Sequence, residues 1–235
     1  MLDETTSGNG GRFVLVFDVP QDKSLRAVGR ELEAAGDLKA AVGLLNEKVD
    51  PLMKIRVAVR SCDDGTLYDP SKREIQICLE DVVETRELLA DYASSGQELT
   101  ERGIIVDTVN HEAARALLHV HNIAFTGREE DVADQFSAYM SMRRGSAGLD
   151  DLESAAYGYE ISADAFEQDS SDEHASDAQR AANYQCYVYG SNKRKSEHLI
   201  AKDGLTKQRA EFCWQEWENL RDGWHRLLGD AGALR

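Results

Sequence analysis

The feature that most constrains this chain is one stretch, HEAARALLHVHNIAFTGREEDVAD, which runs from His111 to Asp134. His111 and Glu112 open the stretch, and Glu130 and Asp134 close it with a spacing of four residues. Residues four apart lie on one face of an α-helix, and a turn-like segment with Gly127 separates the two ends. We therefore expect two successive helices whose facing sides carry a histidine and three carboxylates. The helices are expected over residues 104–122 and 129–143.

The order of these residues is that of a metal site in which one ligand has changed. In the motif H-E-x-x-H, two histidines one helical turn apart bind zinc and the glutamate acts as general base. The fifth position here is Arg115, and a guanidinium stays protonated and cannot bind a metal ion. His111 and Glu130 fit two of the three protein ligands that a catalytic zinc ion requires. Glu112 fits the base, and Asp134 fits the carboxylate that orients a ligand imidazole.

Neither of the nearby histidines is an easy replacement for the missing ligand. His119 is two turns from His111, about 12 Å along the helix axis, and His121 points elsewhere by helical phase. Arg115 is instead expected to lie among the carboxylates and to take the place of a divalent ion by bidentate pairing with one of them. A His-Glu pair or a Glu-x-x-x-Asp pattern alone is common on solvated helix faces, so the prediction depends on their order and spacing.

Charge and hydropathy exclude several classes of partner. The net charge of −16 argues against nucleic acid and against an anionic membrane surface. The sequence has no apolar run near the roughly 20 residues that span a bilayer. Its first residues, MLDETTSGNGGR, lack the apolar core of a secretory signal. The expected compartment is therefore the cytoplasm.

The flanking segments predict short strands and further helices. Residues 12–19 are β-branched and aromatic, and residues 53–62 and 73–80 alternate between apolar and polar side chains. We expect the last two segments to form an antiparallel hairpin with a long loop. Residues 22–48 have apolar positions at helical spacing on both sides of Gly36, which predicts two helices or one kinked helix. Asp107 or Thr108 is the expected N-cap of the helix that carries His111.

These elements predict an α+β fold with a small antiparallel sheet, an active-site helix pair and a mainly helical C-terminal part. Residues 1–11 are expected to be disordered. The α+β lobe is expected over 12–143, and it carries both halves of the central stretch. RRGSAGLDD, at 143–151, is the expected linker. A helical lobe packed on the first is expected over 151–235.

The four cysteines fall into two local pairs, and the sequence leaves their state open. Cys62 and Cys78 lie in expected strands, and Cys186 and Cys213 lie in successive helices. Cytoplasmic thiols are usually reduced, yet both pairs are placed so that a cross-link is feasible. The sequence has no C-x-x-C motif, which argues against a structural zinc site.

Four segments together resemble, in order, a family of bacterial zinc metallopeptidases catalogued as a domain of unknown function. They are C…YDP…I-x-I-C-x-E from Cys62 to Glu80, GREEDVADQFSAYM, DEHASDAQRAANYQCYVYG, and L-x-x-x-RAEFC…W. The resemblance covers roughly residues 50–228. It implies a zincin-like fold of the thermolysin (gluzincin) type, a zinc ion, and a peptide or peptide-like substrate or partner. Members of the family carry the full H-E-x-x-H and look exported, and this chain departs from them on both counts.

By resemblance, His111 and Glu130 are the metal ligands, Glu112 is the base, and Asp134 supports the ligand histidine. The resemblance also implies that the cysteine pairs are disulfides by descent. Arg115, in the place of the second histidine, brings both the zinc ion and proteolysis into question.

The resemblance also draws attention to His174 and Arg180. In a zinc peptidase, a histidine or arginine opposite the metal stabilises the oxyanion that forms during hydrolysis. His174 would also be able to bind the metal from the second lobe. The alternative is that the acidic segment around His174 is only the entry of a helix, favoured by the helix dipole.

Three functions are compatible with this pattern, and the first is preferred. It is a diverged enzyme that works in the ancestral peptide-binding cleft, with Glu112 as acid or base. Arg115 would then bind an anionic substrate group or pair with Glu130. The second is a zinc peptidase with a substitute ligand such as His174. The third is a non-catalytic pseudopeptidase that binds a peptide or protein partner in the cleft.

Overall fold

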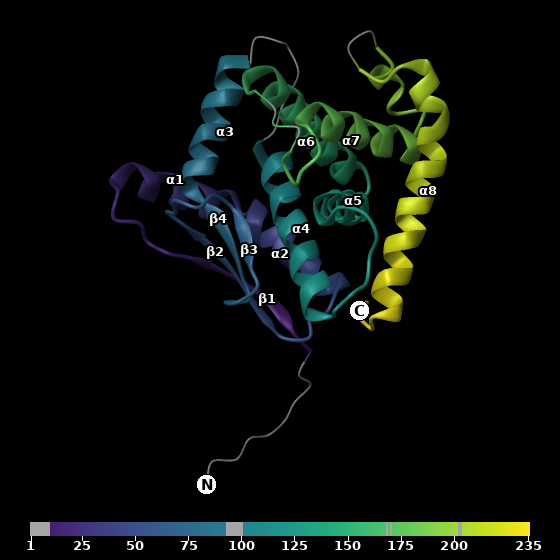
Figure 1. Cartoon of the computed structure of the whole chain (residues 1–235). Helices are drawn as coiled ribbons and strands as arrows, with labels where there is room; N and C mark the ends of the chain where they lie inside the picture. The colour runs from purple at the N-terminus through teal and green to yellow at the C-terminus, as the bar shows by residue number, and fades with distance from the viewer. Residues whose placement is uncertain (1–9, 93–100, 168, 170, 202–203) are drawn as a thin grey trace.

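The strands gather at one side of the molecule, α4 lies beside them, and α5 to α8 lie beyond α4 (Figure 1). The computed structural model describes residues 10–92, 101–167, 169, 171–201 and 204–235. The elements are β1 (Arg12–Phe17), α1 (Lys23–Ala35), α2 (Asp37–Lys48), β2 (Lys54–Arg60), β3 (Leu67–Asp69), β4 (Glu74–Cys78), α3 (Leu79–Tyr92), α4 (Glu101–Val120), α5 (Glu129–Met142), α6 (Ser146–Ala165), α7 (Asp177–Ser191), η2 (Glu197–Leu199) and α8 (Lys207–Asp230).

The sheet is mixed, so the expected antiparallel sheet and its hairpin are wrong. Its strand order is β1-β2-β4-β3. β2 runs parallel to both β1 and β4, and only β3 is antiparallel to its neighbour β4. The reason is that β3 lies inside the connection between the two segments, where the sequence pattern predicts a long loop. The chain crosses from β2 to the sheet edge, forms β3, and returns through a turn at Arg73, whose φ is 53°.

Apolar side chains of the sheet form one buried layer beneath the helices. Alternation puts Ile55, Val57, Ile75 and Ile77 into the core, as the sequence pattern predicts. α2 packs against β1 and α4, and α4 packs against β3 and β4. The two helices thus cover the sheet, and α4 is enclosed between the sheet on one side and α5 and α6 on the other.

Of the two alternatives expected over residues 22–48, two helices or one kinked helix, the structure has two helices. Asp22 caps α1 and accepts hydrogen bonds from the amides of Ser24 and Leu25, which leaves fewer unpaired N–H groups at the helix start. Gly36 has a φ of 78° and ends α1 directly before α2. This left-handed conformation is favourable for glycine because it has no Cβ.

The helix ends in the C-terminal half differ from the predicted ones. α4 is described from Glu101 onward, so Asp107 lies inside the helix and is not its N-cap. α6 begins at Ser146, so most of the expected linker is helical.

Buried apolar residues from Phe13 to Ala233 form one connected core. The division into two lobes stays a prediction, and residues 1–9 of the segment expected to be disordered lie outside the described residues.

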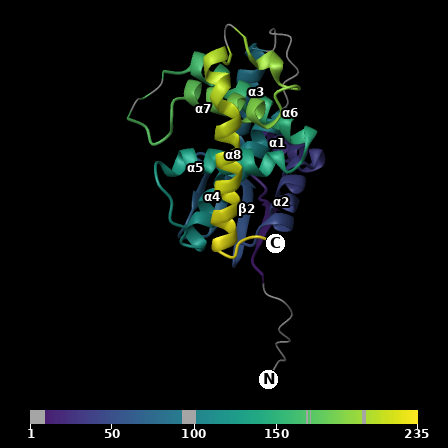
Figure 2. The ribbon, with the colours of Figure 1, turned by 90° about the vertical axis from the view of Figure 1, so that its right-hand side faces the viewer.

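α8 runs along the other helices and brings the C-terminus back to the base of the sheet (Figure 2). Leu234 forms an isolated antiparallel bridge with Val49, and the amide of Arg235 donates to the carbonyl of Lys48 at 3.0 Å. No helix in the described part of the chain combines the length and the apolar character needed to cross a membrane.

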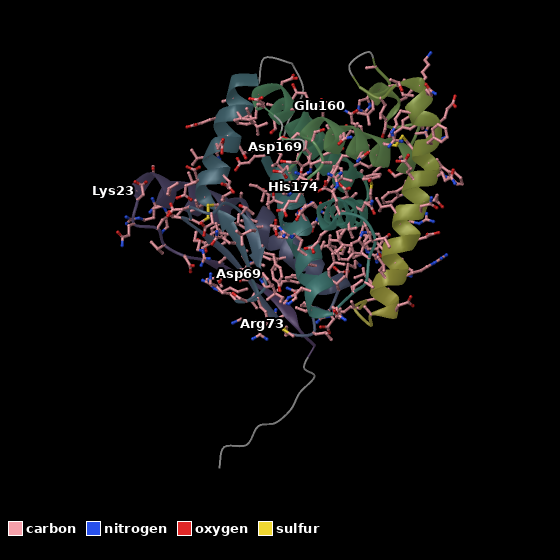
Figure 3. The ribbon with its side chains drawn as sticks, in the orientation of Figure 1. Lys23, Asp69, Arg73, Glu160, Asp169 and His174 are labelled. Atoms are coloured by element: carbon pink, nitrogen blue, oxygen red, sulfur yellow. A yellow bond between two sulfur atoms is a disulfide. The ribbon has the colours of Figure 1, made fainter. Side chains whose placement is uncertain are left out.

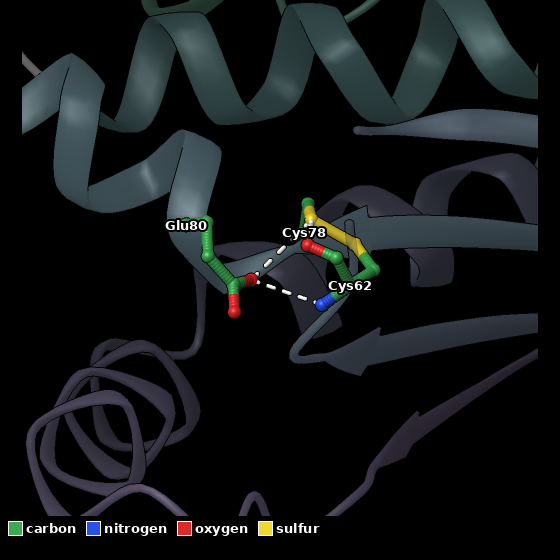
Figure 4. A group of neighbouring side chains, drawn as sticks. All are labelled: Cys62, Cys78 and Glu80. Atoms are coloured by element: carbon green, nitrogen blue, oxygen red, sulfur yellow. Dashed lines mark hydrogen bonds between the residues drawn. A yellow bond between two sulfur atoms is a disulfide. The ribbon is translucent and has the colours of Figure 1, made fainter. Parts of the chain in front are cut away.

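Both cysteine pairs form disulfides. Cys62 is bonded to Cys78 at the end of β4, and Cys186 in α7 is bonded to Cys213 in α8. Figure 4 shows the first bond beside Glu80, whose carboxylate accepts a hydrogen bond from the Cys62 amide at 3.0 Å. Disulfides persist in oxidising compartments, so the cytoplasmic location expected from the first residues stays a prediction.

The contact between α5 and α6 leads to a stability prediction at Gly148. A Cβ at this position would lie 1.7 Å from the carbonyl oxygen of Ser141. Gly148→Ala should therefore force the two helices apart and lower the free energy of unfolding by about 2 kcal/mol. Urea unfolding followed by circular dichroism measures the change.

Gly43, in the middle of α2, is the matched control, because a Cβ there meets nothing within 4 Å. Gly43→Ala should raise the free energy of unfolding by about 0.5–1 kcal/mol through helix propensity. Equal effects of the two substitutions would contradict the close helix contact at Gly148.

Candidate metal centre

The centre is built where α4 faces the start of α5. His111 and Glu112 lie in the middle of α4 and are both 5% exposed. α5 begins with three acidic residues, Glu129, Glu130 and Asp131, and negative charge in a first turn is favoured by the helix dipole. Because the two helices are joined by a short connection and pack together, the first turns of α5 meet the middle of α4.

His111 lies between two carboxylates of α5, as its sequence spacing predicts. Its Nε2 is 2.8 Å from Oε2 of Glu130, and its Nδ1 is 2.8 Å from Oδ1 of Asp134. Glu130 is 3% exposed and Asp134 is 7% exposed. The imidazole is therefore held at both nitrogens inside the protein.

His174 lies in the loop between α6 and α7 (Figure 3), and from there it reaches the same carboxylate. Its Nε2 lies 3.1 Å from Oε2 of Glu130, and its ring stacks near that of His111 with centroids 6.1 Å apart. Asp172 fixes the loop by accepting hydrogen bonds from the amide and Nδ1 of His174, at 2.7 and 2.9 Å. One carboxylate oxygen thus faces two imidazole nitrogens from distant parts of the sequence.

These three side chains fit a divalent metal ion such as zinc. The ligand atoms of His111, Glu130 and His174 lie within 4.8 Å of one another. Two imidazoles and one carboxylate form a donor set found at catalytic zinc. Beside them, Oε2 of Glu112 is buried and has no hydrogen-bond partner among the described residues. A buried carboxylate oxygen without a partner is costly, and a water molecule or ligand in the centre would satisfy it.

Arg115 lies among the acidic residues but divides its contacts. Its guanidinium is 3.2 Å from Glu129, 3.3 Å from Oε1 of Glu130, and 3.7 Å from Glu112. This differs from the bidentate pair with one carboxylate that the sequence led us to expect. The contact with Glu130 uses the oxygen that does not face the histidines, so Arg115 and the two imidazoles share this carboxylate.

Asp134 has a partner that sequence reasoning assigned differently. Arg180, in α7, donates from Nε and Nη2 to the Asp134 carboxylate at 2.9 and 2.7 Å. Its guanidinium also stacks over the ring of Tyr159 at 4.0 Å. The family resemblance suggests an oxyanion-binding role for Arg180, but these contacts commit its guanidinium to fixing Asp134.

A buried network around Asp107 lies one helical turn before His111, and sequence reasoning missed it. The hydroxyls of Ser137 and Tyr184 each donate to Oδ1 of Asp107 at 2.6 Å, and the hydroxyl of Tyr159 donates to Oδ2 at 2.9 Å. The donors come from α5, α6 and α7. The only sequence signal was an aspartate at the same helical phase as His111.

The pKa values describe a proton held at the centre when no metal is present. Burial by itself would lower the pKa of His111, but hydrogen bonds with Asp134 and Glu130 raise it to about 10. Burial opposes ionisation of Asp134, yet Arg180 and His111 lower its pKa to about 2. The pKa of Glu130 is held well below its usual range, because hydrogen bonds from His111 and His174 outweigh burial. A metal ion would have to displace the His111 proton.

Glu112 has the opposite shift. Burial raises its pKa, and the nearby charges of His111 and Arg115 oppose this effect only in part. The amide of Tyr68, in the edge strand β3, also opposes the rise by hydrogen-bonding to this carboxylate, which lowers its pKa. A raised carboxyl pKa suits a group that takes up and returns a proton.

The remaining candidates lie outside the centre. His119 pairs through Nδ1 with the hydroxyl of Tyr68 at 2.9 Å, and His121 pairs with the carbonyl of Asp50 at 2.6 Å. Cys62, Cys78 and Glu80 also lie close together, but the two sulfurs are bonded to each other and offer no thiolate.

Comparison with known proteins places the chain in a family. A family model described as "Putative metallopeptidase" matches residues 17–228, which include every residue of the centre. This match confirms the family resemblance found in the sequence. No curated protein and no solved structure matches the chain.

The ion pairs of the centre should make stability depend on pH in the metal-free protein. The His111 pKa is raised above its ordinary value of 6.5, so its stabilisation is complete below about pH 6.5 and is lost as pH rises through about 10. The Asp134 pKa is lowered, so its stabilisation is present above about pH 4 and is lost as pH falls through about 2. With a chelator present, the contribution of this pair should be greatest between about pH 4 and 6.5.

The variant Asp134→Asn tests this pH dependence of stability. It leaves the buried guanidinium of Arg180 without its carboxylate and the His111 imidazolium with only one of its two carboxylates, so it should cost about 3 kcal/mol of unfolding free energy at pH 6. The difference from the unmodified protein should shrink as pH approaches 10. Asp131→Asn is the control, because Asp131, in the same helix as Asp134, forms an exposed pair with Arg128 just before the helix. A pH-independent difference for Asp134→Asn would contradict the raised His111 pKa.

Proposed function

Since the chain belongs to this metallopeptidase family, we propose that it hydrolyses peptide bonds with a divalent metal ion held by His111, Glu130 and His174. Zinc is the metal that the donor set favours. This is the second of the three functions considered from the sequence. A mainly helical α+β fold with a small sheet is consistent with a diverged zincin-like architecture.

One observation carries the proposal: His174 meets His111 at the same oxygen of Glu130. The α4 motif has lost its second histidine to Arg115, and an imidazole from another segment restores the count of three protein ligands. Catalytic zinc sites keep three protein ligands and one open position. A histidine that served only a helix entry would have no reason to lie within 3.1 Å of a buried carboxylate.

The chain's own residues then have distinct tasks. Asp134 accepts the Nδ1 proton of His111 and so directs the lone pair of Nε2 towards the centre. Arg180 keeps Asp134 ionised. Arg115 holds Oε1 of Glu130, which leaves Oε2 facing the two imidazoles. When bound, a zinc ion supplies Lewis acidity that polarises the scissile carbonyl.

Glu112 is the proposed general base. Its Oε2 would take a proton from the attacking water, and the same carboxyl group would return this proton to the leaving amine nitrogen. The backbone amide of Tyr68, in the edge strand β3, hydrogen-bonds to this carboxylate and opposes the rise in its pKa, and α4 packs against β3. An extended peptide lying along that strand would bring its carbonyl groups over Glu112.

A zinc-binding measurement tests the ligand set. Protein dialysed against metal-free buffer should bind one zinc ion per chain, measured by titration calorimetry and elemental analysis. His174→Ala should lower the zinc affinity by about 100-fold or more. His198→Ala is the matched control, because His198 is an exposed histidine that also pairs with a carboxylate, that of Glu153. Equal zinc affinity of the two variants would rule out His174 as a ligand.

The same protein allows the base to be tested separately. Glu112→Gln should keep its zinc and lower kcat for peptide hydrolysis by a factor of about 10²–10⁴. Unchanged turnover would remove Glu112 from the reaction.

A second candidate is a diverged enzyme or pseudopeptidase that works without metal, and the position of Arg115 favours it. Its guanidinium stands among Glu112, Glu129 and Glu130 and supplies positive charge where the family motif binds a cation. Near-zero zinc in the purified protein would select this function over the first.

Arg115→His tests whether α4 still presents the family site. The variant restores H-E-x-x-H, so its zinc affinity should exceed that of the unmodified protein by about tenfold or more. Arg128→His, which changes an exposed arginine of the neighbouring loop, should leave the affinity unchanged. No gain in the Arg115→His variant would mean that this helix does not direct position 115 at the metal.

A further inference from the structure

A pocket of about 330 Å³ lies between α3, α4, α6 and α7. Arg180, in its lining, connects it to the metal centre through Asp134. Its walls include the apolar side chains of Leu88, Leu89, Ile104 and Phe166. A smaller apolar recess of about 40 Å³ adjoins it and shares Ile104 and Thr108. The volume of the pocket is therefore sufficient for a long aliphatic side chain.

The charged groups around this pocket are mostly acidic. Asp81, Glu84 and Asp177 line it from α3 and α7. Asp81 accepts a hydrogen bond from the Thr66 amide at 2.7 Å, and Asp177 accepts one from the Ser162 hydroxyl at 2.6 Å. These contacts fix both carboxylates in place.

Among the described residues that line the pocket, Arg180 is the one cation, and its charge is already balanced. Arg180 donates two hydrogen bonds to Asp134 and stacks on Tyr159. Its contacts hold it towards the metal centre. The pocket therefore combines apolar walls with a net negative rim.

We propose that this pocket binds the side chain of a lysine or arginine in the peptide substrate, next to the bond that is cut. The aliphatic stem of such a side chain packs against apolar walls while its cationic head reaches the carboxylates. The net charge of −16 on the whole chain attracts the same class of peptide. The position relative to the cut bond rests on the proposed function; the binding preference does not.

The position of the pocket along α4 sets its distance from the reaction. Thr108 precedes His111 by three residues and Glu112 by four, which is about 5–6 Å along the helix. An extended peptide advances about 3.4 Å per residue. The basic residue is therefore within one or two positions of the scissile bond.

A lysine walk tests the position. In ten-residue peptides of alanine, glycine and serine, a single lysine is moved one position at a time, and the products of the zinc-loaded protein are identified by mass spectrometry. The cut bond should move with the lysine at a constant offset of one or two residues. Cuts at bonds that do not follow the lysine would overturn the proposal.

Replacing the lysine by norleucine isolates the charge, because norleucine keeps the aliphatic stem and lacks the ammonium group. The value of kcat/KM should be about 5- to 10-fold higher for the lysine peptide. Glu84→Lys should abolish this preference. Glu87→Lys, on the same helix but away from the pocket lining, should keep it. Equal rates for both peptides in the unmodified protein would overturn the proposal.

Binding without turnover separates this proposal from the proposed function. Fluorescence anisotropy with the Glu112→Gln protein measures the Kd of labelled lysine and norleucine peptides. If no peptide is hydrolysed by any form of the protein, the proposed function fails. Tighter binding of lysine, lost in the Glu84→Lys, Glu112→Gln double variant, would still support the pocket assignment. Equal Kd values would overturn it.

Discussion

The hydrogen bonds of His111 to Glu130 and Asp134 are the interaction on which the centre depends. They join the middle of α4 to the first turns of α5 where water has little access. A buried ionised group is tolerated only when it is paired and hydrogen-bonded. The partners come from several elements. The helix pair supplies His111 and its two carboxylates, Arg180 of α7 pairs with Asp134, and the loop before α7 places His174 against Glu130.

The charges of the centre form a sequence that alternates in sign. Arg180 faces Asp134, Asp134 faces His111, His111 faces Glu130, and Arg115 closes the series on the far side of Glu130. Each charge therefore has a partner, whether a proton or a metal ion occupies the imidazole. This arrangement accommodates an arginine at the position where H-E-x-x-H has its second histidine. Arg115 pairs with Oε1 of Glu130 and does not compete for Oε2, which faces the two histidines.

The sequence predicted those features that depend on local spacing. The facing helices, the break at Gly36, and the closeness of His111 to Glu130 and Asp134 follow from helical periodicity. The strand order did not, because alternation predicts a strand without saying which neighbour it pairs with. β3 is only three residues long and was hidden in a turn-rich segment.

The contacts of Asp107, Arg180 and His174 could not be derived in the same way. The sequence predicts Asp107 to be a helix cap, because its true partners lie 30, 52 and 77 residues away and leave no local signal. His174 was a candidate only by resemblance, and its meeting with Glu130 is set by how α6 and α7 pack. Such pairings depend on tertiary structure, which no pattern within a single helix encodes.

The two disulfides give the unfolded chain an unusual form. One closes a sequence separation of 16 residues and the other of 27. Cross-links act chiefly on the unfolded state, by about 3 kcal/mol for a loop of about 15 residues. Unfolded, this chain is two small rings at the ends of a long open segment, and that segment contains His111, Glu130 and His174. The disulfides thus lower the conformational entropy of the two ringed segments in the unfolded chain. No disulfide restrains the segment between them, so the residues of the centre are brought together by packing and charge alone.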